Sequence, residues 1–153
     1  MKGISVNGTI KTYNSIPKTW GSILGVNYMS DEDLKGLGFY DVVRPSTKQS
    51  EQLGDIYFDA DAEVFTYPVE SKTYTQTVAE LKEQKIANLK ALYNSELAKT
   101  DWYIIRAQEG IAAPQEILDA RAALRSESAT HEQAINAKTT KASVIDYELP
   151  SFT

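Results

Sequence analysis

The fold is decided by residues 75–137, which read TQTVAELKEQKIANLKALYNSELAKTDWYIIRAQEGIAAPQEILDARAALRSESATHEQAINA. Apolar residues recur here at steps of three, four or seven, the spacing that lines one face of a helix. In the first part of the stretch they are Val78, Leu81, Ile86, Leu89, Leu92, Tyr93, Leu97 and Ile104. In the second part, Ile117, Leu118, Leu124 and Ile135 lie near one face of a second helix. Between the two groups, Gly110 suits a left-handed helix end and Pro114 suits the first turn of a new helix. The stretch therefore predicts two long helices folded into a hairpin.

A helical pair has only two layers, so apolar surface that the helices do not bury on each other must face another part of the chain or another molecule. Residues 100–106, TDWYIIR, are the richest source of such surface. Trp, Tyr and Arg dominate binding hot spots because they bury a large area and carry a polar group. We therefore predict that Trp102 and its neighbours face a partner. The alternative is that Trp102 and Ile105 pin the hairpin to the preceding part of the chain.

The amino-acid composition excludes several classes of protein for this chain. Hydrophobic residues make up 42% and charged residues 24% of the 153 residues, close to the average for a globular domain. No run approaches the roughly 18 apolar residues that span a bilayer, and no signal-peptide pattern opens the chain, so we expect no membrane partner. Without cysteine there is no disulfide and no thiolate chemistry. A net charge of −5, with no basic segment, makes nucleic-acid binding unexpected.

The first residues predict a small β-rich structure. Residues 4–13, ISVNGTIKTY, predict a hairpin, because Asn7 and Gly8 accept positive φ at both centres of a tight turn. Residues 18–20 are predicted to form a short helical turn, and Trp20 is expected to anchor a small core. Its predicted partners are Ile23, Leu24, Val26 and Tyr28.

Further elements follow before the long helices. Ser30 and three acidic residues predict the start of a short helix that ends at Gly36 or Gly38. A strand is predicted over residues 39–43 and a polar loop over residues 46–54. Residues 56–58 and 64–67 predict a second hairpin. Its second strand is placed at a sheet edge, because Pro68 weakens pairing at the strand's end.

These elements predict an α+β chain with three parts. Residues 1–72 form a small, mostly antiparallel β module with one short helix. Residues 73–137 form the long α-helical hairpin. Residues 138–153 form a C-terminal tail, in which residues 142–147 are predicted to add a last strand that docks on the rest.

Signals for catalysis or metal binding are weak. His131, the only histidine, has no orienting partner or nucleophile close by in the sequence. Asp59 and Asp61 resemble the start of a calcium loop, but Val64 stands where that loop needs glycine. Aspartates in hairpin turns more simply bond nearby backbone groups. We therefore predict a protein that is not an enzyme and needs no cofactor and no metal.

Two stretches resemble one known family. Residues 100–106 with Glu109, Gly110, Pro114 and residues 116–125 (EILDARAALR) look like the C-terminal signature of small tail fibre assembly proteins of tailed bacteriophages. Upstream, residues 17–20 (PKTW) and 29–43 (MSDEDLKGLGFYDVV) are similar to the N-terminal module of related phage tail accessory proteins. The opening hairpin and residues 144–145 lie outside these motifs.

The resemblance implies a non-enzymatic chaperone that binds a trimeric tail fibre protein and helps it fold or assemble in the host cell cytoplasm. The alternative is a permanent adaptor or cap that stays on the fibre in the virion tail. Carried over by position, the signature falls on Asp101, Trp102, Arg106, Pro114, Leu118, Arg121 and Arg125.

Seven residues are predicted to contact the partner. They are Trp102, Tyr103, Ile105, Arg106, Leu118, Arg121 and Arg125. Two of the arginines, Arg106 and Arg121, have an alternative use in ion pairs within the chain, with Glu109 or Asp119 as acidic neighbours. Such exposed pairs contribute only about 0–1 kcal/mol, which would explain these residues poorly. Self-association of the chain is also left open.

Overall fold

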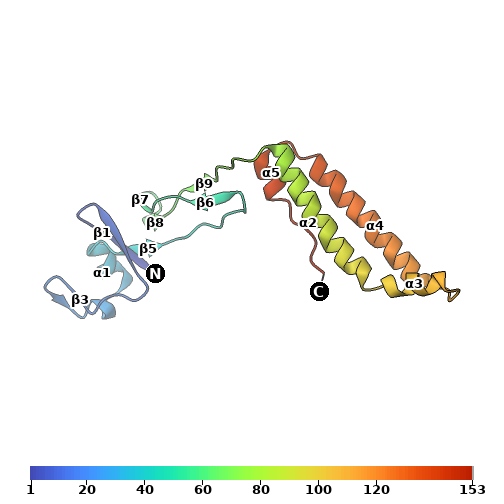
Figure 1. Ribbon diagram of the computed structural model, residues 1–153. Coiled ribbons are helices and arrows are strands. Elements are labelled where there is room, and N and C mark those ends of the chain that lie inside the picture. Colours follow the sequence, from blue (N-terminus) through green and yellow to red (C-terminus); the bar gives the residue numbers. More distant parts are fainter. Residues whose placement is uncertain (153) are drawn as a thin grey trace. The chain divides into compact units, whose positions relative to one another are not determined.

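A computed structural model describes residues 1–152 of the protein. The chain divides into two compact units, Met1–Lys72 and Thr73–Thr153. The first unit holds the strands and a short helix, and the second holds only helices and irregular segments (Figure 1). The predicted α+β class is therefore confirmed.

A curled, mixed five-stranded sheet forms the centre of the first unit, with strand order β2-β1-β5-β8-β7. The strands are β1 (Lys2–Val6), β2 (Thr9–Tyr13), β5 (Tyr40–Val42), β7 (Tyr57–Asp59) and β8 (Val64–Thr66). All neighbours are antiparallel except β5 and β8, which are parallel. Asn7 and Gly8 join β1 to β2 with φ values of 51° and 80°, so the predicted opening hairpin is confirmed.

Trp20 lies in a strand, and the predicted helical turn at residues 18–20 is wrong. β3 (Thr19–Trp20) pairs with β4 (Ile23–Leu24), because Gly21 at φ 59° lets the chain reverse within two residues. The Trp20 ring packs edge-on against Phe39, with 5.1 Å between ring centroids. Trp20 therefore contacts the core as expected, through a different local structure.

The core of the first unit differs from the predicted one. One buried cluster consists of Ile4, Val26, Leu34 and Phe39, and Phe65 on β8 is buried as well. Trp20 and Ile23 pack against this cluster. Leu24 and Tyr28 are instead 80% and 85% exposed, so their predicted place in the core is wrong. Leu24 ends the short β4 strand, and Tyr28 ends a single 3-10 turn, η1 (Val26–Tyr28), that directs only Val26 inward.

The predicted cap at Ser30 is confirmed. The Ser30 hydroxyl accepts a hydrogen bond of 3.2 Å from the backbone N–H of Asp33, at the start of α1 (Asp31–Gly36). Three acidic residues follow the cap, where the positive end of the helix dipole favours them.

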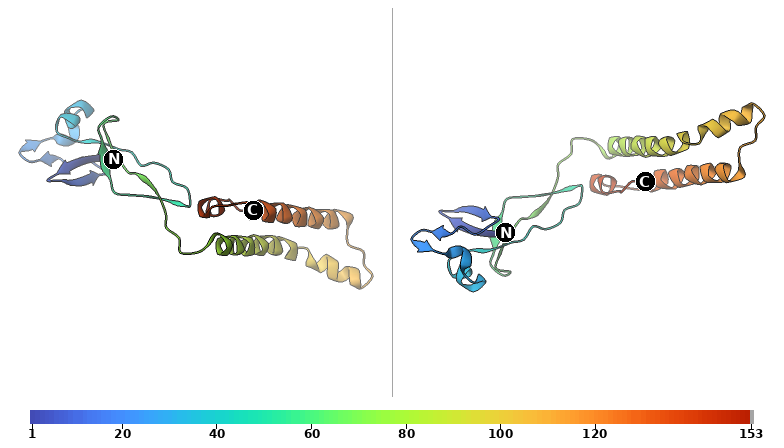
Figure 2. Two further views of the ribbon diagram at one scale, coloured as in Figure 1. Left: turned by 90° about the horizontal axis from the view of Figure 1, so that it is seen from above. Right: turned by 90° about the horizontal axis from the view of Figure 1, so that it is seen from below.

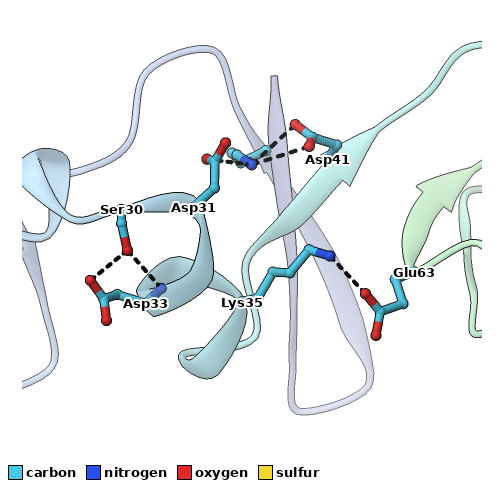
Figure 3. Close-up of polar contacts among 7 residues, drawn as sticks. Ser30, Asp31, Asp33, Lys35, Asp41 and Glu63 are labelled. Carbon is cyan, nitrogen blue, oxygen red and sulfur yellow. Dashed lines mark hydrogen bonds and ion pairs between the residues drawn. The ribbon is translucent and has the colours of Figure 1, made fainter.

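Ion pairs tie α1 to the sheet, as Figure 3 shows. The Lys2 ammonium lies 2.9 Å from Asp31 on α1 and 3.2 Å from Asp41 on β5. Burial acts to lower the pKa of Lys2, but the two carboxylates outweigh it and leave that pKa raised. Lys35 and Glu63, 2.7 Å apart, add a second link, from α1 to the turn before β8.

Two predictions about residues 46–71 are wrong. Part of the expected polar loop is a strand, β6 (Glu51–Leu53), which pairs antiparallel with β9 (Val69–Ser71) in a separate ribbon. The strand placed at a sheet edge, β8, lies between β5 and β7. Pro68 does not interrupt it, because β8 ends at Thr66 and the Pro68 carbonyl accepts from the Gly54 N–H across the ribbon.

We expect Gly3→Ala to destabilise the first unit by about 1–3 kcal/mol, the usual range for overpacking. A Cβ atom at Gly3 would lie 2.7 Å from a ring carbon of Phe65 and 3.0 Å from a methyl carbon of Val42. The matched control is Gly36→Ala in α1, where a Cβ meets nothing within 4 Å and improves helix propensity. Chemical denaturation measures both, and equal stabilities would contradict the tight packing at Gly3.

Within residues 73–152, the described part of the second unit, the chain forms four helices. They are α2 (Val78–Ala98), α3 (Asp101–Gln108), α4 (Gln115–Asn136) and α5 (Lys141–Ile145). α2 and α4 run antiparallel and side by side (Figures 1 and 2). Lys82 donates to the Asn136 carbonyl over 2.7 Å, and Lys90 pairs with Glu132 over 3.2 Å.

The first arm is not the single helix that the apolar spacing predicts. α2 ends at Ala98, and Thr100, with φ −119° and ψ 7°, separates it from α3. At its other end, α2 begins with a capping box in which Thr77 and Glu80 satisfy each other's backbone N–H groups. The structure thus has two antiparallel helices, α2 and α4, with a separate α3 where one continuous arm was predicted.

Residues 142–147 do not form the predicted strand. Thr140 and Ser143 make a capping box that starts α5 at Lys141, and such local bonds favour a helix turn over an extended chain. Lys85 on α2 donates to the carbonyl of Ile145 over 2.9 Å, which fixes the end of α5. Burial lowers the pKa of Lys85.

A third layer covers the α2–α4 pair. One core cluster of buried residues in the second unit consists of Leu89, Tyr93 and Ile135, and Leu81 and Val144 are buried as well. Residues 147–152, called here the docked segment, have no regular secondary structure. The segment lays Tyr147, Leu149 and Phe152 against this core. Part of the apolar surface that two helices leave uncovered is therefore covered by the chain itself.

Candidate functional site

A buried arginine organises the break between α2 and α3. Arg121 on α4 is only 6% exposed. Its guanidinium donates to the Leu97 carbonyl over 2.6 Å, to the Thr100 hydroxyl over 2.7 Å and to the Asp101 carboxylate over 2.8 Å. These three acceptors lie in the last turn of α2, in the link between the two helices and at the first residue of α3. One side chain therefore fixes the start of α3 relative to the pair.

The outer part of α3 exposes large apolar side chains. Trp102 is 45% and Ile105 is 59% exposed, and their spacing of three residues places them on one face of the helix. The Arg106 guanidinium lies over the Trp102 ring at 5.3 Å from its centroid, a cation–π contact. The ring of Tyr103 lies 3.7 Å from that of Trp102, centroid to centroid. An arginine and two aromatic rings are thus held together on an accessible helix.

The turn after α3 completes this surface. Gly110, with φ 92°, ends the helix. Its backbone N–H donates to the Ala107 carbonyl, and the Ile111 N–H donates to the Arg106 carbonyl, which are the two bonds of a Schellman motif. The predicted glycine cap is therefore confirmed. Pro114 lies one residue earlier than predicted, at the N-cap of α4 rather than in its first turn. A hollow of about 120 Å³ is lined by Tyr103, Arg106, Ile111, Ala112 and Pro114.

We call the exposed residues of α3, the turn and the start of α4 the tip surface. Its apolar members are Trp102, Ile105, Ile111 and Leu118, with Arg106 beside them. Within the described part of the second unit, the large hydrophobic side chains found exposed all lie in residues 102–118. Such a concentration at one end of a helical pair is typical of a protein-contact surface.

The structure separates the seven predicted contact residues into three groups. On the tip surface it places Trp102, Ile105, Arg106 and Leu118, with Tyr103 half-buried beneath. Arg125 is exposed on α4, one helical turn beyond Arg121. Arg121 is buried, so this structure does not offer it to a partner; its acidic neighbour is Asp101, neither Glu109 nor Asp119.

One residue of the tip surface, Ile111, was not among the contact residues predicted from the sequence. Ile111 is 48% exposed and lines the hollow. Its signal in the sequence was an isoleucine between a helix-ending glycine and a helix-starting proline, where no helix face can bury it.

Residues considered for catalysis or metal binding have structural partners. The His131 ring nitrogen Nδ1 lies 2.6 Å from the Tyr147 hydroxyl, which joins α4 to the docked segment. Asp59 accepts from the backbone N–H groups of Asp61 and Ala62, the turn role that such aspartates commonly have. Across residues 1–152 no group of three metal-ligating side chains comes together. Within residues 73–152 the exposed large hydrophobic side chains gather on the tip surface, which is therefore the candidate site of the second unit.

Of the helices within residues 1–152, none has the length and apolar character that crossing a membrane requires. Comparisons of the chain with protein-family models, curated proteins and solved structures gave no match.

Proposed function

We propose that this chain is a tail fibre assembly protein of a tailed bacteriophage, a chaperone that binds the fibre protein through the tip surface. The observation that carries the proposal is the exposure of Trp102 and Ile105 on α3, with Arg106 held over the indole. These are the residue types that dominate binding hot spots. They also belong to the stretch that resembles the family's C-terminal signature.

The proposed mechanism is coverage of apolar surface on an unfinished fibre. A subunit that has not yet trimerised exposes surface that its neighbours later bury, and exposed apolar surface promotes aggregation. We interpret α2, α3 and α4 as one long helical hairpin whose first arm is broken at Thr100, with the tip surface at its turn. An apolar helix face docks in a groove of a partner through side chains three and four residues apart. Trp102, Ile105 and Arg106 have this spacing.

This function involves no enzymatic step, and it takes place in the cytoplasm of the infected host. A chaperone leaves before the particle is complete. The second candidate, a permanent adaptor or cap on the fibre, uses the same surface but stays in the virion tail. Mass spectrometry of purified particles separates them, because only the second predicts this chain in a fixed ratio to the fibre.

The proposal is tested by producing the fibre protein with and without this chain. We expect soluble fibre trimers only when the chain is present, as measured by size-exclusion chromatography with light scattering. Co-expression with the Leu24→Ala variant, altered at an exposed residue of the first unit, should give as much trimer as the unaltered chain. Normal trimers formed without the chain would overturn the proposal.

A further inference from the structure

The docked segment occupies the α2–α4 pair in the manner of a bound peptide. Residues 147–152 form neither helix nor strand. They contact the buried core through Tyr147, Leu149 and Phe152, at positions i, i+2 and i+5. The Phe152 ring meets the Tyr93 ring edge-on, with 5.1 Å between centroids. Linear peptides bind other proteins through anchor side chains of this kind, inserted into apolar pockets or grooves.

The segment follows α5, and α5 is held by contacts that do not depend on the docking of the segment. α5, which precedes it, is fixed to the helical unit by Lys85, which donates to the Ile145 carbonyl, and by Lys141, which donates to the Tyr74 carbonyl over 2.8 Å. Opening at Asp146 would therefore release residues 147–152 while α5 and the helical pair stay in place. Local opening of this kind costs less free energy than unfolding of the helices.

The contacts also define which peptide the surface accepts. Its first position takes a tyrosine, because the Tyr147 hydroxyl bonds His131 over 2.6 Å and Lys138 lies 5.3 Å from the ring centroid. Its later positions take an aliphatic side chain and then an aromatic ring against Tyr93. Pro150 favours the extended backbone at Leu149 that this spacing needs.

We propose that the surface of α2 and α4 beneath the docked segment is an exchangeable peptide-binding site. Its external ligand is an extended segment of another protein that carries tyrosine, an aliphatic residue and an aromatic residue at spacing i, i+2 and i+5. The chain's own residues 147–152 act as the resident competitor. The proposal does not rest on the proposed role in fibre assembly, since it follows from the contacts of this segment alone.

Competition between residues 147–152 and an external peptide decides how tightly the external peptide binds. A segment tethered to its own site has an effective concentration on the order of millimolar. An external ligand therefore binds with an apparent affinity reduced by the fraction of molecules whose site is open. Weakening the resident segment should raise that fraction and tighten binding of the external ligand.

The test uses a fluorescein-labelled peptide of residues 146–153, DYELPSFT, and fluorescence anisotropy with the full chain. We expect the Leu149→Ala/Phe152→Ala chain to bind it at least tenfold more tightly than the unaltered chain does. The matched control is Glu148→Ala, which alters an exposed residue of the same segment and should bind like the unaltered chain. A peptide with alanine at its three anchor positions should bind none of them.

The result that overturns the proposal is a folded double variant, shown by circular dichroism, that binds no more tightly than the control. If the double variant loses its helices, Tyr147→Phe replaces it, because that change removes only the bond to His131. It should raise peptide affinity measurably, and no increase overturns the proposal. An unaltered chain that is dimeric, and becomes monomeric on Phe152→Ala, would assign the site to a second copy and also overturn it.

Discussion

Replacing Arg121 by alanine is expected to lower the free energy of unfolding of the second unit by about 3 kcal/mol. The substitution removes the donor to the Thr100 hydroxyl oxygen and one of the donors to the Leu97 carbonyl, which keeps the Thr100 N–H and hydroxyl. It also opens a cavity at the break between α2 and α3. The Asp101 side chain is 54% exposed, so water can solvate its charge and keeps the loss from being larger. Urea denaturation followed by circular dichroism measures the change.

Arg125→Ala is the matched control, because it removes the same side chain one turn further along α4, from an exposed position. Its effect should stay within about 0.5 kcal/mol, as for most surface substitutions. Equal losses from the two variants would contradict the structural role of Arg121. Both arginines belong to the resembled signature, so the pair of variants separates its folding residues from its surface residues.

The double substitution Trp102→Ala/Arg106→Ala should weaken binding to the fibre protein by at least about 3 kcal/mol, more than a hundredfold in Kd. Both side chains lie on the tip surface, and the cation–π contact makes them one anchor. Their exposure means that little core packing is lost, so the stability should fall by less than about 1 kcal/mol. Isothermal titration calorimetry measures the binding, and thermal melting measures the stability.

Leu24→Ala is the control for this experiment, because Leu24 is a large hydrophobic side chain that is 80% exposed in the first unit. It should change neither binding nor stability. Unchanged fibre binding by the double variant would remove the tip surface from the proposed function. Unfolding of that variant would show that Trp102 supports the fold, the alternative that its sequence context left open.

The features that could be predicted well from the sequence depend on contacts between residues that are close along the chain. Asn7 and Gly8 make a tight turn because of their own backbone preferences, and Ser30 caps α1 through a residue three positions on. Gly110 ends α3 through bonds within one helical turn. The exposure of Trp102 and Ile105 agrees with one of the two uses that their sequence allowed, contact with a partner.

The features that sequence missed depend on partners far along the chain. The place of β8 inside the sheet is set by β5, more than twenty residues earlier. The burial of Arg121 depends on acceptors between Leu97 and Asp101, 20 to 24 residues away. Residues 142–147 were predicted to form a strand, but the capping bonds between Thr140 and Ser143 start a helix there. The spacing of residue types along the sequence does not show which distant residues will contact one another.

Parallel pairing between β5 and β8 also sets the order in which the first unit can be completed during synthesis. β1, β2 and β5 lie within the first 42 residues and can pair as soon as these have left the ribosome. The outer side of β5 then waits for Val64–Thr66, because a parallel neighbour cannot come from a short hairpin. In that interval the nascent chain presents an open strand edge, the kind of edge to which other chains add.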